Sequence, residues 1–412
     1  MTQDTSIIET SKWSRIFPYI AVGVFFLPYI SGGVRPDNML LLLLIILSPF
    51  LVFLKIEKEL LGMLLLAVAP FFLICARLFF ENYLHPFGWS AKIINQYSMF
   101  FSSILYFIFI RRFCSQNAFF RAFAIIAAIV CVYGLIQLLF PHSLLVTHLI
   151  PLYAGQPEQI RELSKVEQAL RNLRASSIFV QPSTFGAFAL LANAVAVWGM
   201  KNTSAKRFKY LMVFSVIGGI ASVTKTYLLG AMLFFLYLYG KNIFTIKRLL
   251  HACALFFFIF FGIDIVSKGY FSAILEKMVR LGVFQALFGT RFGAGGTITS
   301  GMHQITSLNG LLVGGGSETR FLFYADSMPY MLLLLSGFAF LVVFYLPILF
   351  LLFLTIRSKV TAYLKRPFVG LNLVYLFLSL AFPIYIQARL FPLFVILCLY
   401  FLFESKALYP EQ

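Results

Sequence analysis

Long apolar runs separated by short polar stretches dominate this chain and restrict what it can fold into. Of its 412 residues, 61% are hydrophobic and 12% are charged, whereas soluble domains carry about 45–50% apolar and about 25% charged residues. A helix needs about 20 mostly apolar residues to cross a bilayer. The sequence therefore predicts an all-α, polytopic integral membrane protein with a single membrane domain over residues 1–412.

About twelve of these runs qualify as transmembrane helices. The first follows Lys12 and Arg15 as in a signal peptide, but no small-residue cleavage site comes after it, so we interpret it as an uncleaved span. The predicted spans cover residues 16–30, 38–54, 60–80, 93–110, 118–140, 178–199, 210–224, 226–240, 249–266, 329–356, 368–386 and 390–403.

The basic residues of the short loops predict the orientation of these spans. Short cytoplasmic loops carry an excess of lysine and arginine. Every second short loop is rich in these residues, and the loops between them hold one each, namely Arg35, Lys92, Lys225 and Arg389. The alternation predicts cytoplasmic N- and C-termini. It also accounts for most of the net charge of +18, which therefore does not indicate nucleic acid as a partner.

Two long loops, residues 141–177 and 267–328, fall on the predicted outer side. Long loops cross the membrane regardless of charge, so their basic residues are not topology signals. Contact with lipid headgroups is one explanation, and binding of an anionic substrate is the other. Each loop contains a stretch with apolar residues at helical spacing and charged residues opposite, which predicts an amphipathic helix lying on the outer membrane surface.

The amphipathic pattern is clearest in the first loop. Leu163, Val166, Leu170 and Leu173 recur on one face of a helix, and Arg171 lies on another. In the second loop a similar helix is followed by glycine-rich stretches. These lack a preceding strand and a closing Gly-Lys-Ser/Thr, so we do not interpret them as a nucleotide-binding motif.

Arginine and lysine outnumber carboxylates among the polar residues of the outer side. The chain has no H-E-x-x-H, no G-x-S-x-G and no paired carboxylates on one helix, so metal-dependent hydrolysis and Ser-His-Asp chemistry lack support. Metal sites favour clustered carboxylates or histidines. The planar guanidinium instead binds phosphate oxygens with two hydrogen bonds. The fitting ligand carries a diphosphate at the headgroup level and a lipid tail between the helices.

The run RASSIFVQPSTFG, from Arg174 to Gly186, resembles the start of a span in the bacterial O-antigen polymerase/ligase superfamily, which includes the Wzy-type polysaccharide polymerases. Three further features follow in the same order as in that family: Thr224-Lys225-Thr226 before a span, Arg291 with His303 and Gly314-Gly315-Gly316 in the large outer loop, and Ala325-Asp326-Ser327 followed by Ser336-Gly337. The similarity covers about residues 120–360.

This resemblance implies a GT-C-like membrane glycosyltransferase that uses an undecaprenyl-diphosphate donor and needs neither a metal nor another cofactor. It also implies that Arg174 and Arg291 bind the diphosphate and stabilise it as it leaves. Lys225 stands where the family has Ser-Arg, and it keeps the charge without the bidentate fork. Arg171 is either a further substrate contact or part of a solvated helix face. Arg320 either joins the site or pairs with a nearby carboxylate.

The expected general base separates the two branches of this family. The ligase branch places a histidine at the start of the span after the glycine turn, where this chain has Asp326. The difference favours a polymerase and makes Asp326 the candidate base for the acceptor hydroxyl, with His303 and Glu318 behind it. For Asp326 and His303 the alternative is a solvated loop residue.

The expected function is polymerisation of undecaprenyl-diphosphate-linked repeat units into a surface polysaccharide at the outer face of the bacterial cytoplasmic membrane. The expected partners are the lipid-linked glycan, membrane lipids, a chain-length regulator and a flippase. Two alternatives stay open: an O-antigen ligase with lipid A core as acceptor, and a transporter of solutes or lipid-linked glycans. A transporter typically shows internal repeats and polar residues at the midplane, and we find no such repeat.

Overall fold

The computed structural model describes residues 12–29, 36–46, 56–84, 91–154, 160–243, 264, 269–282, 296–305, 308–316, 326–387 and 389–408. These residues form helices and connections, with no β-strand among them. The elements are α1 (Lys12–Gly23), η2 (Val24–Phe26), α2 (Pro36–Ile46), α4 (Lys58–Leu84), α5 (Ala91–Ile110), α6 (Gln116–Leu139), α7 (Leu144–Ala154), α8 (Ile160–Arg171), α9 (Pro182–Asn202), α10 (Lys206–Ala221), α11 (Lys225–Ile243), α13 (Tyr270–Leu281), α15 (Thr297–Gln304), α16 (Leu308–Val313), α18 (Met328–Arg357), α19 (Ala362–Ser379), η4 (Ile384–Ile386) and α20 (Leu390–Leu408).

Four of the described helices, α4, α6, α9 and α18, are long and apolar enough to cross a membrane. Shorter apolar helices accompany them, including the greater part of α5 and α20. The chain is therefore a helical membrane protein, as its composition predicts. The total of twelve spans stays a prediction, and the predicted span 249–266 lies, apart from Asp264, outside the described residues.

Helix α9 is the central helix of the bundle, because it packs against α6, α10, α11 and α19. It is buried on all sides, and alanines and glycines are frequent along it. Small residues let neighbouring helices approach closely, which is how membrane helices gain packing energy. Hydrogen bonds join this core to its neighbours: the hydroxyl of Tyr375 in α19 donates to the carbonyl of Ala187 at 2.7 Å.

The observed helices differ from the predicted spans in several places, including α1, which ends at Gly23 within the predicted span 16–30. Helix α7 lies within the loop 141–177, where no apolar helix was predicted. Helix α18 matches the span 329–356 but is interrupted at Ser336 and Gly337, where the backbone leaves helical geometry. Helix α19 ends at Ser379 and η4 follows Pro383, because proline has no N–H to continue a helix. The predicted span 368–386 is thus a helix followed by a separate turn.

The two predicted amphipathic stretches are helical. Helix α8 buries Val166 and Ala169 and exposes Arg171. Leu173 was predicted to continue this helix, which was wrong: its backbone is left-handed, with φ of 52°. Helix α13 exposes Glu276 and Lys277. That either helix lies on a membrane surface stays a prediction.

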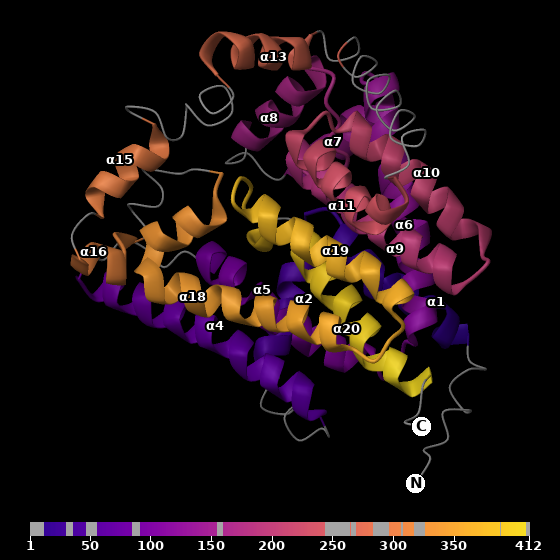
Figure 1. Ribbon diagram of the computed structural model, residues 1–412, viewed down its shortest axis with the longest axis horizontal. Coiled ribbons are helices and arrows are strands. Elements are labelled where there is room, and N and C mark those ends of the chain that lie inside the picture. Colours follow the sequence, from indigo (N-terminus) through magenta and orange to yellow (C-terminus); the bar gives the residue numbers. More distant parts are fainter. Residues whose placement is uncertain are drawn as a thin grey trace.

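Figure 1 shows how the bundle is ordered along one direction. The start of α1 and the end of α20 lie at the same end of the molecule. Helices α8, α13, α15 and α16 lie toward the opposite end. Helix α4 runs along one side beside α18, and the two pack together.

Candidate functional site

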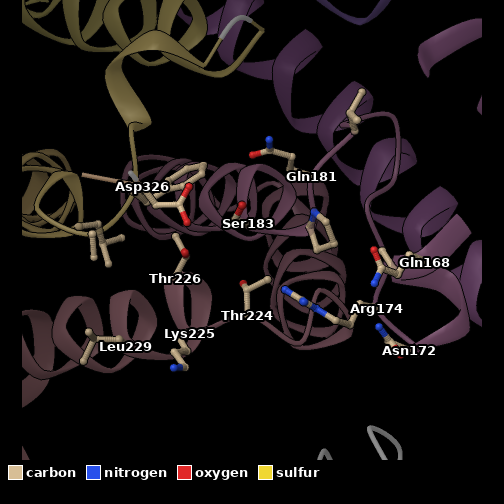
Figure 2. A pocket seen from close by; sticks show the side chains of 16 residues that line it. Gln168, Asn172, Arg174, Gln181, Ser183, Thr224, Lys225, Thr226, Leu229 and Asp326 are labelled. Carbon is tan, nitrogen blue, oxygen red and sulfur yellow. The ribbon is translucent and has the colours of Figure 1, made fainter. Parts of the chain in front are cut away.

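A pocket of about 640 Å³ opens where several helices begin or end. Its described walls are the end of α8, the residues that start α9, the residues that start α11, the end of α19, and Asp326 just before α18. The segments come from widely separated parts of the sequence. Figure 2 shows their side chains around the pocket.

The pocket brings together three of the residues singled out from the sequence, Arg174, Lys225 and Asp326. Two others are described but do not line it: Arg171 is exposed at the end of α8, and His303 is exposed on α15. Arg291, Glu318 and Arg320 lie outside the described residues.

Arg174 is positioned by the turn that ends α8. The N–H of Arg174 donates to the carbonyl of Ala169, and the N–H of Leu173 donates to that of Leu170, both at 2.9 Å. This pair of bonds around a left-handed residue is a Schellman motif. Glycine usually takes the left-handed position, so Leu173 is strained there. The motif reverses the chain at Leu173 and fixes where the backbone of Arg174 lies.

The segment from Ala175 to Gln181, here called the strap, joins this turn to α9. Gln137 of α6 holds the strap at Ser177 with two hydrogen bonds: its amide donates to the Ser177 carbonyl at 2.9 Å, and its oxygen accepts the Ser177 N–H at 2.7 Å. The Ala175 N–H donates to the Ala221 carbonyl at 2.9 Å. Because these groups are buried, the bonds replace those that water would otherwise make.

The start of α11 is shaped by Thr224, which precedes its first residue. The Thr224 hydroxyl accepts the N–H of Tyr227 at 3.3 Å, as an N-cap residue does. The same hydroxyl contacts that of Ser222 at 3.0 Å. Gly186 of α9 lies against both hydroxyls, so the starts of α9 and α11 pack together without an intervening side chain.

Two helices therefore begin at the pocket. Pro182 is the first residue of α9, where its missing N–H costs nothing, and Lys225 is the first residue of α11. A helix N-terminus carries a partial positive charge and unbonded N–H groups, and it attracts anions. These two N-termini add to the positive charges of Arg174 and Lys225.

The pocket is chemically divided. Figure 2 shows Arg174, Asn172 and Gln168 on one side, and Asp326 with Thr226 on the other, with Ser183 and Thr224 between them. The Arg174 guanidinium points toward Thr224. Apolar side chains of Leu229, Leu378 and Phe382 also line the pocket. One pocket thus offers a cationic side around Arg174, a facing side with the Asp326 carboxylate and, near Thr226, Lys225, and an apolar part.

Backbone strain gathers around this pocket. The non-glycine residues with positive φ among those described are Leu173, Ser177, Val223 and Arg389. Leu173 and Ser177 flank Arg174, and Val223 directly precedes Thr224. Such conformations cost about 1–3 kcal/mol each and concentrate at functional sites. Leu173, Ser177 and Val223 lie in segments that shape the pocket, whereas Arg389 lies between η4 and α20 and does not line it.

Several lining residues were not recognised as site residues from the sequence. Ser183 and Thr226 follow the first residues of α9 and α11, and reading each span start as a helix N-terminus would have found them. Asn172 would have required knowledge of the turn at Leu173. No local sequence pattern marked the end of α19 as part of the site. It reaches the pocket only because α19 packs against α9 and α11.

Among the described residues, no three His, Cys, Asp or Glu side chains come together as metal ligands would. The chain matches no known protein-family profile, and no curated protein and no solved structure is significantly similar to it.

Proposed function

We propose that the protein is a membrane-embedded glycosyltransferase that polymerises undecaprenyl-diphosphate-linked oligosaccharide units into a surface polysaccharide. One observation carries the proposal: Arg174, Lys225 and two helix N-termini meet Asp326 in one pocket that also has an apolar lining. The ordered resemblance of the Arg174, Lys225 and Asp326 segments to the O-antigen polymerase/ligase superfamily supports it. The lipid-linked substrate combines an anionic diphosphate, sugars and an apolar tail, which match the charged, polar and apolar parts of this pocket.

The cationic side suits the diphosphate of the donor. A guanidinium forms two parallel hydrogen bonds to phosphate oxygens, and helix N-termini add N–H donors. Negative charge grows on the bridging oxygen as the sugar–phosphate bond breaks, and preorganised positive groups lower the barrier by stabilising it. Arg174 therefore holds the diphosphate and stabilises it as leaving group, and Lys225 contributes a second charge. The apolar residues Leu229, Leu378 and Phe382 suit the first carbons of the lipid tail.

The opposite side suits the acceptor sugar. The acceptor hydroxyl attacks the anomeric carbon of the growing chain, and the bond from that carbon to the diphosphate breaks with its electron pair leaving on undecaprenyl diphosphate. Asp326 accepts the proton of the attacking hydroxyl, which makes it the general base. Thr226, beside Asp326, and Ser183, between the two sides, offer hydroxyls that can hydrogen-bond to a sugar.

The site belongs on the outer face of the bacterial cytoplasmic membrane in this proposal, with both termini in the cytoplasm. The support is the alternation of basic loops and the arrangement in Figure 1, where α1 starts and α20 ends away from α8. A chain-length regulator and a flippase are the partners that such an enzyme requires. Labelling of single cysteines introduced at Glu167 and Lys209 with a membrane-impermeant reagent tests the orientation, since only the first is expected to react in intact cells.

The test is complementation of a strain that lacks the gene, with surface polysaccharide displayed on a gel. The wild-type gene is expected to restore a ladder, whereas Arg174→Ala and Asp326→Asn leave a single repeat unit. We expect each to lower the polymerisation rate about 10²–10³-fold. Arg171→Ala is the matched control, because Arg171 lies three positions earlier but does not line the pocket.

Other outcomes separate the alternatives. Loss of every unit from lipid A core would identify a ligase, and accumulation of lipid-linked units on the cytoplasmic side would identify a transporter. The break in α18 is a feature that transporters share, so this second outcome is a specific competitor. A full ladder in both Arg174→Ala and Asp326→Asn, with normal amounts of inserted protein, would refute the proposed site.

A further inference from the structure

Arg389, between η4 and α20, is a charged residue that this mechanism does not use. It is only 3% exposed, although the sequence places it in the short loop between the last two predicted spans. Removing a guanidinium from water is costly unless other groups accept its hydrogen bonds. The contacts of Arg389 therefore indicate what it does.

The guanidinium joins two distant parts of the backbone. One terminal nitrogen (Nη1) donates to the carbonyl of Ile178 at 2.6 Å, and the other (Nη2) donates to the carbonyl of Leu27 at 3.2 Å. The central carbon lies 5.0 Å from the ring centre of Tyr153 and 5.7 Å from that of Tyr29, and both rings attract the cation.

Three of these four contact residues, Leu27, Tyr29 and Tyr153, belong to segments that hydrogen bonds hold together without Arg389. These segments are here called the frame. The N–H of Tyr29 donates to the carbonyl of Leu152 at 3.1 Å, and the hydroxyl of Tyr153 donates to the carbonyl of Phe26 at 2.9 Å. These bonds tie the end of the first helical segment to α7. Ile178 is different, because it lies in the middle of the strap. Arg389 thus fastens the strap to this frame.

The strap connects two residues of the pocket wall. It starts directly after Arg174 and ends at Gln181, and both line the pocket, whereas Arg389 does not. We propose that Arg389 is a positioning residue that holds the strap so that Arg174 faces the pocket. The rigid two-pronged guanidinium suits this task, because one ammonium group does not present two fixed, divergent donors.

Hydrogen–deuterium exchange of the full-length protein in detergent tests the fastening directly. We expect Arg389→Met to speed exchange across residues 175–181 at least tenfold, while peptides of α4 exchange as in the wild type. Arg389→Lys should fall between the two, since lysine retains the charge and can reach one carbonyl. Arg366→Met is the control, because Arg366 is an exposed arginine in the first turns of α19, away from the end that lines the pocket.

Affinity for undecaprenyl diphosphate in detergent micelles tests the consequence, which rests on the proposed function. We expect Arg389→Met to weaken binding at least tenfold, Arg389→Lys to recover part of the loss, and Arg366→Met to bind normally. If the wild type does not bind this lipid, the proposed function fails and the exchange data alone decide on the fastening.

Unchanged exchange across residues 175–181 in Arg389→Met would overturn the inference. So would faster exchange of the strap and α4 to the same degree, because that describes a general loss of stability. If Arg389→Met is not recovered as folded protein, Arg389→Lys decides, since wild-type exchange in that variant would show that the two-pronged contact is unnecessary.

Discussion

The strap before α9 and the break in α18 both depart from helical geometry, but opposite means hold them in place. Side chains hold the strap: Gln137 binds Ser177, and Arg389 binds Ile178. The break at Gly337 is instead held by direct contact between two stretches of backbone, at glycines that carry no side chain. The N–H of Gly315 donates to the carbonyl of Leu334 at 2.8 Å, so one backbone fits directly into another.

The difference predicts two kinds of response to substitution. A Cβ atom on Gly337 would overlap the Leu312 carbonyl, and one on Gly314 would lie 2.6 Å from the Gly337 nitrogen. Backbone atoms cannot rotate away, so a second substitution cannot relieve either overlap. Around the strap the Ala175 N–H binds a backbone carbonyl, but Ser177 and Ile178 are held by side chains, so conservative or compensating changes there should recover part of any loss.

The largest effect is expected for Gly337→Ala. The φ of 74° is strained for any residue with a Cβ, and the overlap with Leu312 adds to this strain. Together they should lower the free energy of unfolding by about 4 kcal/mol, measured by denaturant unfolding in detergent. Gly240→Ala is the control: it lies in α11 with nothing within 4 Å of an added Cβ, and it should be neutral or stabilise by about 1 kcal/mol. Equal stability of the two variants would contradict the described packing of the break.

The second largest effect is expected for Gln137→Leu. It leaves the buried N–H and carbonyl of Ser177 without their side-chain partner, at a cost of about 2–4 kcal/mol, and exchange across residues 175–181 should accelerate. Gln116→Leu in the same helix removes the hydrogen bond to the carbonyl of Tyr400 and leaves Gln137 in place. It should cost about 1–2 kcal/mol and leave exchange of the strap unchanged. If hydrogen–deuterium exchange across residues 175–181 is as slow in Gln137→Leu as in the wild type, side chains do not hold the strap.

Gly186→Ala should lower stability by less, and a second substitution should recover part of the loss. An added Cβ would lie 2.5 Å from the Thr224 hydroxyl, which costs about 1–2 kcal/mol if the side chain can shift. Thr224→Ala removes this obstacle together with an N-cap worth about 1 kcal/mol. A double-mutant cycle should therefore show that the two losses together are smaller than their sum. Strict additivity would show that Thr224 does not limit the approach of α9 to α11.

The smallest effect is expected for Ser336→Ala. The Ser336 hydroxyl is buried and has no hydrogen-bond partner among the described residues. Its removal should be neutral or stabilise by up to about 1 kcal/mol, although the residue lies at the break itself. A loss above about 1 kcal/mol in thermal or denaturant unfolding would mean that this side chain, and not the glycines alone, holds the break.

The sequence predicted several of the long helices and three residues of the pocket. Apolar runs are long enough to be recognised singly, so α4, α6 and α9 were predicted within a few residues of their observed bounds. Arg174, Lys225 and Asp326 were singled out because their segments resemble, in order, segments of the O-antigen polymerase/ligase superfamily. Local patterns did not show the break in α18. Ser336-Gly337 has no unusual composition, and the partner that occupies the break comes from residues 312–315.

The sequence by itself determined that the chain is a helical membrane protein with arginine-rich connections, because hydrophobic length and charge are properties of local stretches. The tertiary structure alone decided which of those charges share a pocket. The sequence left open whether Arg171 also contacts substrate, and the turn at Leu173 directs only Arg174 into the pocket. From the sequence Arg389 is only the single basic residue of a short outer loop, and packing made it buried. The reason is physical: these roles depend on the backbone carbonyls and helix ends that distant segments bring together.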